Sequence, residues 1–120
     1  MKAEKIMQHL IGKTYQEVLD GISIKKDDGQ CCGCAECDVS DFVKQIQDAQ
    51  NAKLVDAIKF DYADELFGEA RVVVNFIFDV GDNKGVVLGY DLKAGSESGF
   101  MYGAVCDLFY KDELVASASY

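Results

Sequence analysis

The segment Arg71-Val72-Val73-Val74-Asn75-Phe76-Ile77-Phe78-Asp79-Val80 decides the fold. Every even-numbered position in it is large and apolar, whereas Arg71, Asn75 and Asp79 occupy odd-numbered positions. Successive side chains of a β-strand point to opposite faces, so this alternation predicts a strand with one continuous apolar face. Such a face has to be covered by another layer of structure, which the rest of the chain must supply.

Further strands are predicted on both sides of this segment. Before it, Ile58, Phe60 and Tyr62 alternate with charged residues. After it, residues 81–85 predict a hairpin connection, and apolar residues at positions 86, 88, 90 and 92 continue the core face in the next strand. The apolar residues between 18 and 26 indicate an earlier strand, 100–110 a last one, and 116–120 are expected to fray.

Two short helices are predicted to cover the sheet. The first runs over 2–11, where Ile6, Met7, Leu10 and Ile11 form one apolar stripe. The second begins at Asp38 or Ser40, either of which can cap it, and runs to about residue 51, with Phe42, Val43, Ile46 and Ala49 on its apolar face. The prediction is a single acidic α+β domain over 1–120, with two short helices packed on an antiparallel β-meander of four to five strands.

The chain is acidic, with 21 acidic and 12 basic residues and a net charge of −9. Residues 61–120 carry most of this charge, with 11 acidic residues against 4 basic ones. Binding to a phosphate backbone depends on Lys and Arg, and Arg71 is the only arginine, so direct nucleic-acid binding is not expected. The acidity indicates either a solubilising surface or a surface that imitates nucleic acid and binds a basic groove of a partner.

Four acidic residues that are close in sequence form the predicted partner-binding site: Asp61, Asp64, Glu65 and Glu69. Their spacing lacks the glycine and ligand pattern of a calcium-binding EF-hand loop, and a solvated acidic loop is the alternative interpretation. No set of nucleophile, base and orienting residues stands out in the sequence. The chain is therefore predicted to be a binding protein and not an enzyme.

A cysteine-dense segment, Cys31-Cys32-Gly33-Cys34-Ala35-Glu36-Cys37, contains two C-x-x-C steps that share one cysteine. Two thiolates at this spacing can hold one Zn²⁺ or Cu(I) ion, because a short turn brings both sulfur atoms near one point. Cys31, Cys32, Cys34 and Cys37 are the candidate metal ligands, with Cys106 or His9 as a distant fourth ligand. Four cysteines within seven residues are too crowded to close a tetrahedral site easily, so we predict that the protein holds no cofactor. The alternatives are a bound zinc ion, free thiols in a loop, a disulfide within the loop, or a redox-active pair.

The sequence also bears on cellular location. No apolar run approaches the roughly 20 residues of a membrane span, so no membrane contact is expected. The N-terminal residues lead into no sustained apolar segment of a secretory signal. A cytoplasmic protein with reduced thiols is predicted.

Three short segments resemble a family of small, uncharacterised phage proteins. They are Leu10-Ile11-Gly12-Lys13-Thr14, Asp27-Asp28-Gly29 with Cys31-Cys32 after it, and Gly99-Phe100-Met101-Tyr102. The resemblance implies a phage or prophage setting inside a host cell, where small acidic proteins often antagonise host enzymes or defence systems. It carries over no activity.

Three hypotheses about function follow. The first is a non-enzymatic phage-type inhibitor that binds a host defence protein with a basic groove through its acidic surface. The second is a sponge that sequesters a small nucleotide messenger at a homo-oligomer interface, with Lys13, Lys25 and Lys26 meeting phosphate. The third is a small metal or redox protein that uses the cysteine-dense segment.

Overall fold

The computed structural model describes residues 2–27, 33–46, 49–64, 69–80, 83–96 and 104–119. These ranges form eight β-strands, one α-helix and two short 3-10 helices. In chain order they are β1 (Lys2–Lys5), η1 (Gln8–Leu10), α1 (Tyr15–Gly21), β2 (Ile22–Asp27), β3 (Gly33–Asp41), η2 (Ala49–Asn51), β4 (Lys53–Asp64), β5 (Glu69–Val80), β6 (Asn83–Ser96), β7 (Val105–Tyr110) and β8 (Glu113–Ser119).

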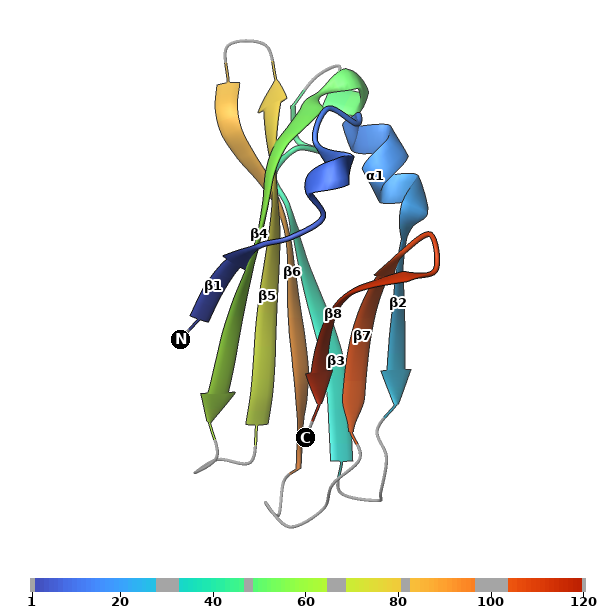
Figure 1. Ribbon diagram of the computed structural model, residues 1–120, viewed down its shortest axis with the longest axis vertical. Helices are drawn as coiled ribbons and strands as arrows, with labels where there is room; N and C mark the ends of the chain where they lie inside the picture. Colours follow the sequence, from blue (N-terminus) through green and yellow to red (C-terminus); the bar gives the residue numbers. More distant parts are fainter. Residues whose placement is uncertain are drawn as a thin grey trace.

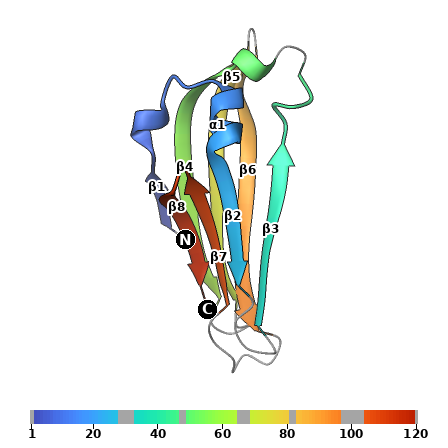
Figure 2. The ribbon, with the colours of Figure 1, turned by 90° about the vertical axis from the view of Figure 1, so that its right-hand side faces the viewer.

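The strands form two antiparallel sheets packed face to face (Figures 1 and 2). One sheet has five strands in the order β1-β4-β5-β6-β3, and the other has three in the order β2-β7-β8. β8 and β7 pack over β5 and β6, and β2 lies beside β3. The long hairpins β4–β5 and β5–β6 therefore build the centre of the five-stranded sheet, and strands from both ends of the chain cover it.

The core lies between the two sheets. The predicted apolar face of β5 is the buried one, since Val74, Phe76 and Phe78 have no exposed surface. Leu88 and Leu92 on β6 are equally buried. From the three-stranded sheet, alternate residues of β7 meet them, so both sheets show the period of two that a half-buried strand requires. The predicted strands around β4, β5 and β6 are confirmed.

The inner face of the five-stranded sheet becomes polar where the cover ends. The three-stranded sheet reaches β5 and β6, while β4 and β1 extend past it (Figure 1). There the inward positions carry Lys59 and Glu4, which are opposite each other in register and form an ion pair of 2.8 Å. Side chains that remain partly exposed to water do not need to be apolar. The inward residues therefore change from apolar to charged at the edge of the covering sheet.

One end of the sandwich is closed by α1 and η2, which lie together in Figure 1. Thr14 is the N-cap of α1, and its hydroxyl accepts a hydrogen bond of 3.2 Å from the backbone N–H of Glu17. The ring of Tyr15 packs edge-on against Phe78, with centroids 5.7 Å apart. None of the helices in the described segments is long and apolar enough to cross a bilayer.

The predicted α+β architecture of two helices on a meander is wrong, because a second sheet covers the first. Residues 2–11 form β1 and η1 in place of a helix. Met7 has a left-handed backbone with φ of 51°, which interrupts any helix at the middle of the predicted apolar stripe. The helix of this region begins later, at Tyr15, and its seven residues are too few for helical periodicity to be visible.

The second predicted helix is also wrong. Residues 33–41 form β3, and of the described residues near the predicted end only the three of η2 are helical. Of the predicted apolar helix face, Val43 and Ala49 are buried, whereas Phe42 is 56% exposed. Of the predicted last strand, residues 105–110 form β7, and residues 100–103 lie outside the described residues. Of the residues expected to fray, 116–119 belong to β8, where Ala116 and Ala118 are buried.

Candidate functional site

The outer face of the five-stranded sheet is left uncovered by the other described elements, and side chains of β3, β6, β5 and β4 meet there. The register of the strands arranges them in rows. One row holds Ser40, Gly89, Asn75 and Ile58; the next Asp38, Asp91, Val73 and Phe60; and the next Glu36, Lys93, Arg71 and Tyr62. The β4 side of this outer face is mainly apolar, and the β3 side is charged.

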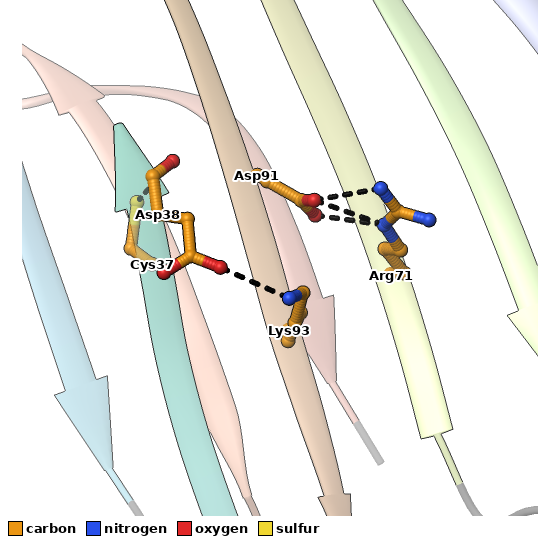
Figure 3. Close-up of polar contacts among 5 residues, drawn as sticks. All are labelled: Cys37, Asp38, Arg71, Asp91 and Lys93. Carbon is orange, nitrogen blue, oxygen red and sulfur yellow. Dashed lines mark hydrogen bonds and ion pairs between the residues drawn. The ribbon is translucent and has the colours of Figure 1, made fainter. Parts of the chain in front are cut away.

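The charged part is a ladder of four side chains on three strands (Figure 3). Asp38 and Asp91 occupy directly opposed positions on β3 and β6. Lys93 forms an ion pair of 3.0 Å with Asp38, and Arg71 binds both carboxylate oxygens of Asp91 at 2.7 to 3.1 Å. Two parallel contacts from one guanidinium fix both groups in one plane, so Asp91 is held more rigidly than Asp38.

The Arg71 guanidinium also joins the charged and apolar parts of the outer face. It lies over the ring of Tyr62 on β4, 5.4 Å from the ring centre. The hydrogen bond that Lys93 donates to Asp38 raises the pKa of the lysine ammonium. Both cations of the ladder are therefore engaged by carboxylates, and the Asp38 carboxylate remains 68% exposed on the β3 side.

An open groove lies beside the ladder, over Gly89 in β6. Its volume is about 240 Å³. The residues lining it, called here the outer-face groove, are Asp38, Ser40, Phe42, Val73, Asn75, Val87, Gly89, Tyr90 and Asp91. A Cβ atom added at Gly89 would lie 3.0 Å from the amide oxygen of Asn75, so the glycine keeps the floor of the groove low.

The chemistry of this lining is specific. Its apolar walls come from Val73, Val87 and the exposed ring of Phe42. Its charged members are Asp38 and Asp91, and the described lining contains no Lys, Arg or His. Such a groove can accept a side chain that has an apolar stem and a cationic head, because the stem meets the walls and the head meets the Asp38 carboxylate and the Phe42 ring.

Three of the four residues of the predicted acidic site lie in the neighbouring strands β4 and β5. Asp61 is at an inward position of β4, opposite Val72, beyond the edge of the covering sheet. Asp64 is on the same strand and is paired in register with Glu69 of β5. Glu65 lies outside the described residues. The role of these four residues in partner binding stays a prediction.

The predicted cysteine site is only partly described. Cys31 and Cys32 lie outside the described residues, and Cys34 and Cys37 are both in β3. Three residues of extended strand span about 10 Å, so the Cα atoms of this pair are farther apart in β3 than they would be in a tight turn. Within the described ranges, no three His, Cys, Asp or Glu side chains are grouped to hold a metal ion. The metal site stays a prediction.

The three lysines considered for phosphate binding do not form one site. Lys13 precedes α1 and pairs with Glu17 at 3.8 Å. Lys25 and Lys26 are on β2, on the far side of that helix, and line an open groove of about 410 Å³ together with Asp27 and Asp107. The two carboxylates in this lining oppose an anionic ligand, and the nucleotide sponge stays a prediction.

Sequence reasoning did not identify the outer-face groove. The sequence predicts Asp38 or Ser40 as a helix cap and Phe42 on the apolar face of that helix, whereas the structure places all three in the lining of the groove. One signal was present: Gly89 is an outward position in a strand whose inward positions are apolar, and a glycine within a strand often marks a close approach of another group.

Comparison with known proteins adds no family to this description. No protein-family model, no curated protein sequence and no solved structure matches the chain.

Proposed function

We propose that this chain is a non-enzymatic binding protein that docks a basic segment of a partner protein in the outer-face groove. The observation that carries the proposal is the lining of the groove, in which the described charged residues, Asp38 and Asp91, are both acidic and the walls are apolar. A lysine or arginine side chain of the partner places its stem on Val73 and Val87 and its head beside Asp38.

The wider surface supports the same kind of partner. The net charge of −9 attracts a basic protein over distances of about a Debye length, which raises the rate of association. Phe42 is 56% exposed at the rim, and an exposed aromatic ring next to a carboxylate is a common anchor in protein interfaces. Inhibition of a host protein in a phage setting is one use of such binding and remains a prediction from the sequence.

A random-peptide display library, selected on the immobilised protein, tests the proposal. We expect enrichment of peptides with Lys or Arg beside an apolar residue. The affinity of a selected peptide is then measured by fluorescence anisotropy for three variants. Phe42→Ala and Asp38→Asn should each weaken binding about fivefold or more, because each removes a contact worth roughly 1 kcal/mol. Asp38→Asn should also flatten the salt dependence of binding.

Leu114→Ala is the matched control. Leu114 is 54% exposed, close to the exposure of Phe42, and belongs to β8 of the other sheet. This variant should bind the peptide as the wild type does. Enrichment of acidic peptides, or binding that is unaffected by both groove variants while their circular dichroism spectra are native, would show that the outer-face groove is not the binding site.

A further inference from the structure

Two cysteines from different sheets meet inside the sandwich. Cys37 is at an inward position of β3, opposite Leu92 of β6, and Cys106 is fully buried in β7. Several Cα atoms of β3 lie within 8 Å of Cα atoms of β7, which is closer than the roughly 10 Å that usually separates packed sheets. The two thiols lie close enough for each to affect the pKa of the other. Burial has the largest effect on both; Cys106 acts to raise the pKa of Cys37, and Cys37 acts to lower that of Cys106.

Both cysteines are free thiols, and their surroundings keep them protonated at neutral pH. Burial raises the pKa of Cys37 to about 11, with smaller contributions in the same direction from Cys106, Asp38 and Asp91. Burial also raises the pKa of Cys106, and Asp107 adds to it. The Lys26 ammonium, on the cross-strand neighbour of Cys106 in β2, acts in the opposite direction on both thiols.

We propose that Cys37 and Cys106 are a site for a reversible disulfide that joins the two sheets, formed by exchange with a small-molecule disulfide such as oxidised glutathione. A disulfide requires Cα atoms about 4.4 to 6.8 Å apart, so the close approach of β3 and β7 leaves little movement to be made. β3 is the edge strand of its sheet and is paired only with β6, which lets it move more easily than a central strand.

The accessibility of the two thiols fixes the order of the steps. Cys37 is half-buried and Cys106 is buried, so Cys37 reacts first. The Cys37 thiolate attacks one sulfur of oxidised glutathione, a mixed disulfide forms, and one glutathione thiolate leaves. The Cys106 thiolate then attacks the Cys37 sulfur and releases the second glutathione thiolate. Two cysteine thiols are oxidised, one glutathione disulfide is reduced, and the two thiol protons end on the two glutathione molecules.

The bond would act on the proposed binding face. β3 carries Cys37 on its inner side and the groove residues Asp38 and Ser40 on its outer side (Figure 3 shows Cys37 beside Asp38). Tying this edge strand to β7 fixes one wall of the outer-face groove. The link also closes a long loop of chain, which reduces the conformational entropy of the unfolded state and raises the melting temperature.

The test uses the full chain with Cys31, Cys32 and Cys34 changed to serine, so that Cys37 and Cys106 are the remaining cysteines. This variant is incubated with excess oxidised glutathione at pH 7, 8 and 9. We expect a mass loss of two hydrogen atoms and a tryptic cross-link between residues 27–44 and 94–111. The rate should rise from pH 7 to pH 9, because the thiolate is the nucleophile.

Two further variants in this background define the steps. Adding Cys106→Ser should stop the reaction at a protein carrying one glutathione, whereas adding Cys37→Ser should leave the buried thiol unmodified. The cross-linked protein should melt at a higher temperature than the reduced one, and dithiothreitol should reverse the change. If the folded triple variant keeps two free thiols, or stops at the mixed disulfide at pH 9, the proposal is wrong; this result does not depend on either added substitution.

Discussion

Asp38 on β3 and Asp91 on β6 lie directly opposite each other on the outer face of the five-stranded sheet. In the next row, Lys93 and Arg71 are opposed in the same way. Like charges that face each other across a strand pair destabilise a sheet. Here each repulsion is offset along a diagonal, by Lys93 with Asp38 and by Arg71 with Asp91. The stability of this face therefore depends on the four charges together.

A double-mutant cycle on Arg71 and Asp91 tests this dependence. Arg71→Met should lower the free energy of unfolding by about 0.5–1 kcal/mol, because Asp91 then faces Asp38 without its own cation. Asp91→Asn should cost less in the Arg71→Met background than in the wild type, since it then removes a repulsion. Urea unfolding at low salt measures both effects. Additive effects of the two substitutions would mean that Arg71 and Asp91 are not energetically coupled.

Tyr90 predicts a loss of stability at alkaline pH. Burial raises the pKa of its phenol from 10.0 to about 12, and the nearby Asp41 carboxylate acts in the same direction. The folded protein therefore holds this proton more tightly than the unfolded chain, so the contribution is complete below pH 10 and is lost as the pH rises from 10 to 12. Between pH 10 and pH 12, the free energy of unfolding of the wild type should fall by roughly 2 kcal/mol more than that of Tyr90→Phe.

Guanidinium unfolding at pH 9, 10, 11 and 12 gives this comparison, because lysine titration is common to both proteins. Tyr15→Phe is a second variant to include. Burial and a hydrogen bond to Asp41 also raise the pKa of the Tyr15 phenol, so this substitution should reduce the alkaline loss in the same sense. Parallel curves for the wild type and both variants would contradict the prediction.

The centre of the five-stranded sheet could be predicted because one of its faces is packed and the other is open. This arrangement imposes a period of two on β5 and β6, and residues such as Phe76 and Asn75 show it directly in the sequence. In the second sheet burial also alternates along β7, but the residue types do not show it, because Val105 and Phe109 at the less buried positions are apolar too. β2 is exposed along most of its length, and its place beside β7 is set by a contact between distant parts of the chain.

The false helices have a local cause. Ile6 and Met7 are partly buried against the core without forming a helix, so their spacing imitates an amphipathic stripe. The same holds for Val43 and Ile46, which follow β3 in a turn. Apolar residues of a short non-helical segment can have the spacing of an amphipathic helix when the segment packs against the core. Such a segment is distinguished from a helix by its contacts with distant parts of the chain, which the local sequence does not show.

The candidate site was hidden for a related reason. Sequence reasoning grouped acidic residues by their distance along the chain, whereas the outer-face groove is assembled across strands. Asp38 and Asp91 become neighbours only when β3 pairs with β6, a pairing between segments that are not consecutive strands. Gly89 indicates where along β6 another group approaches closely. Its neighbours Ser40 and Asn75 follow from the strand register, which the sequence does not show.

We expect that Tyr110→Phe does not destabilise the protein. Its hydroxyl is buried and has no hydrogen-bond partner among the described residues. A buried polar group without a partner costs about 1–3 kcal/mol of desolvation, so Tyr110→Phe should leave the melting temperature unchanged or raise it. Tyr15→Phe at the same end of the sandwich is the contrast, because it removes a hydrogen bond to Asp41 and should lower the melting temperature. A clear loss of stability in Tyr110→Phe would reveal a partner for this hydroxyl.

Gly21→Ala should be among the most damaging small substitutions. Gly21 ends α1, and its carbonyl oxygen accepts a hydrogen bond of 3.0 Å from the backbone N–H of Lys111, which docks the helix on the β7–β8 turn. A Cβ atom at this position would lie 2.3 Å from the Tyr110 ring, so either the ring or the helix end has to move. Overpacking of this kind costs typically 1–3 kcal/mol, to be measured by urea unfolding.

Gly89→Ala is the control for this prediction. The nearest atom to its added Cβ is the side-chain oxygen of Asn75 at 3.0 Å, at the end of a flexible side chain on an open face, so it should cost well under the value for Gly21→Ala. Combining Gly21→Ala with Tyr110→Leu should recover part of the lost stability, because the smaller side chain vacates the space that the methyl group needs. If Gly21→Ala unfolds at the wild-type urea concentration, or the second substitution recovers nothing, then the helix end is not packed against the Tyr110 ring.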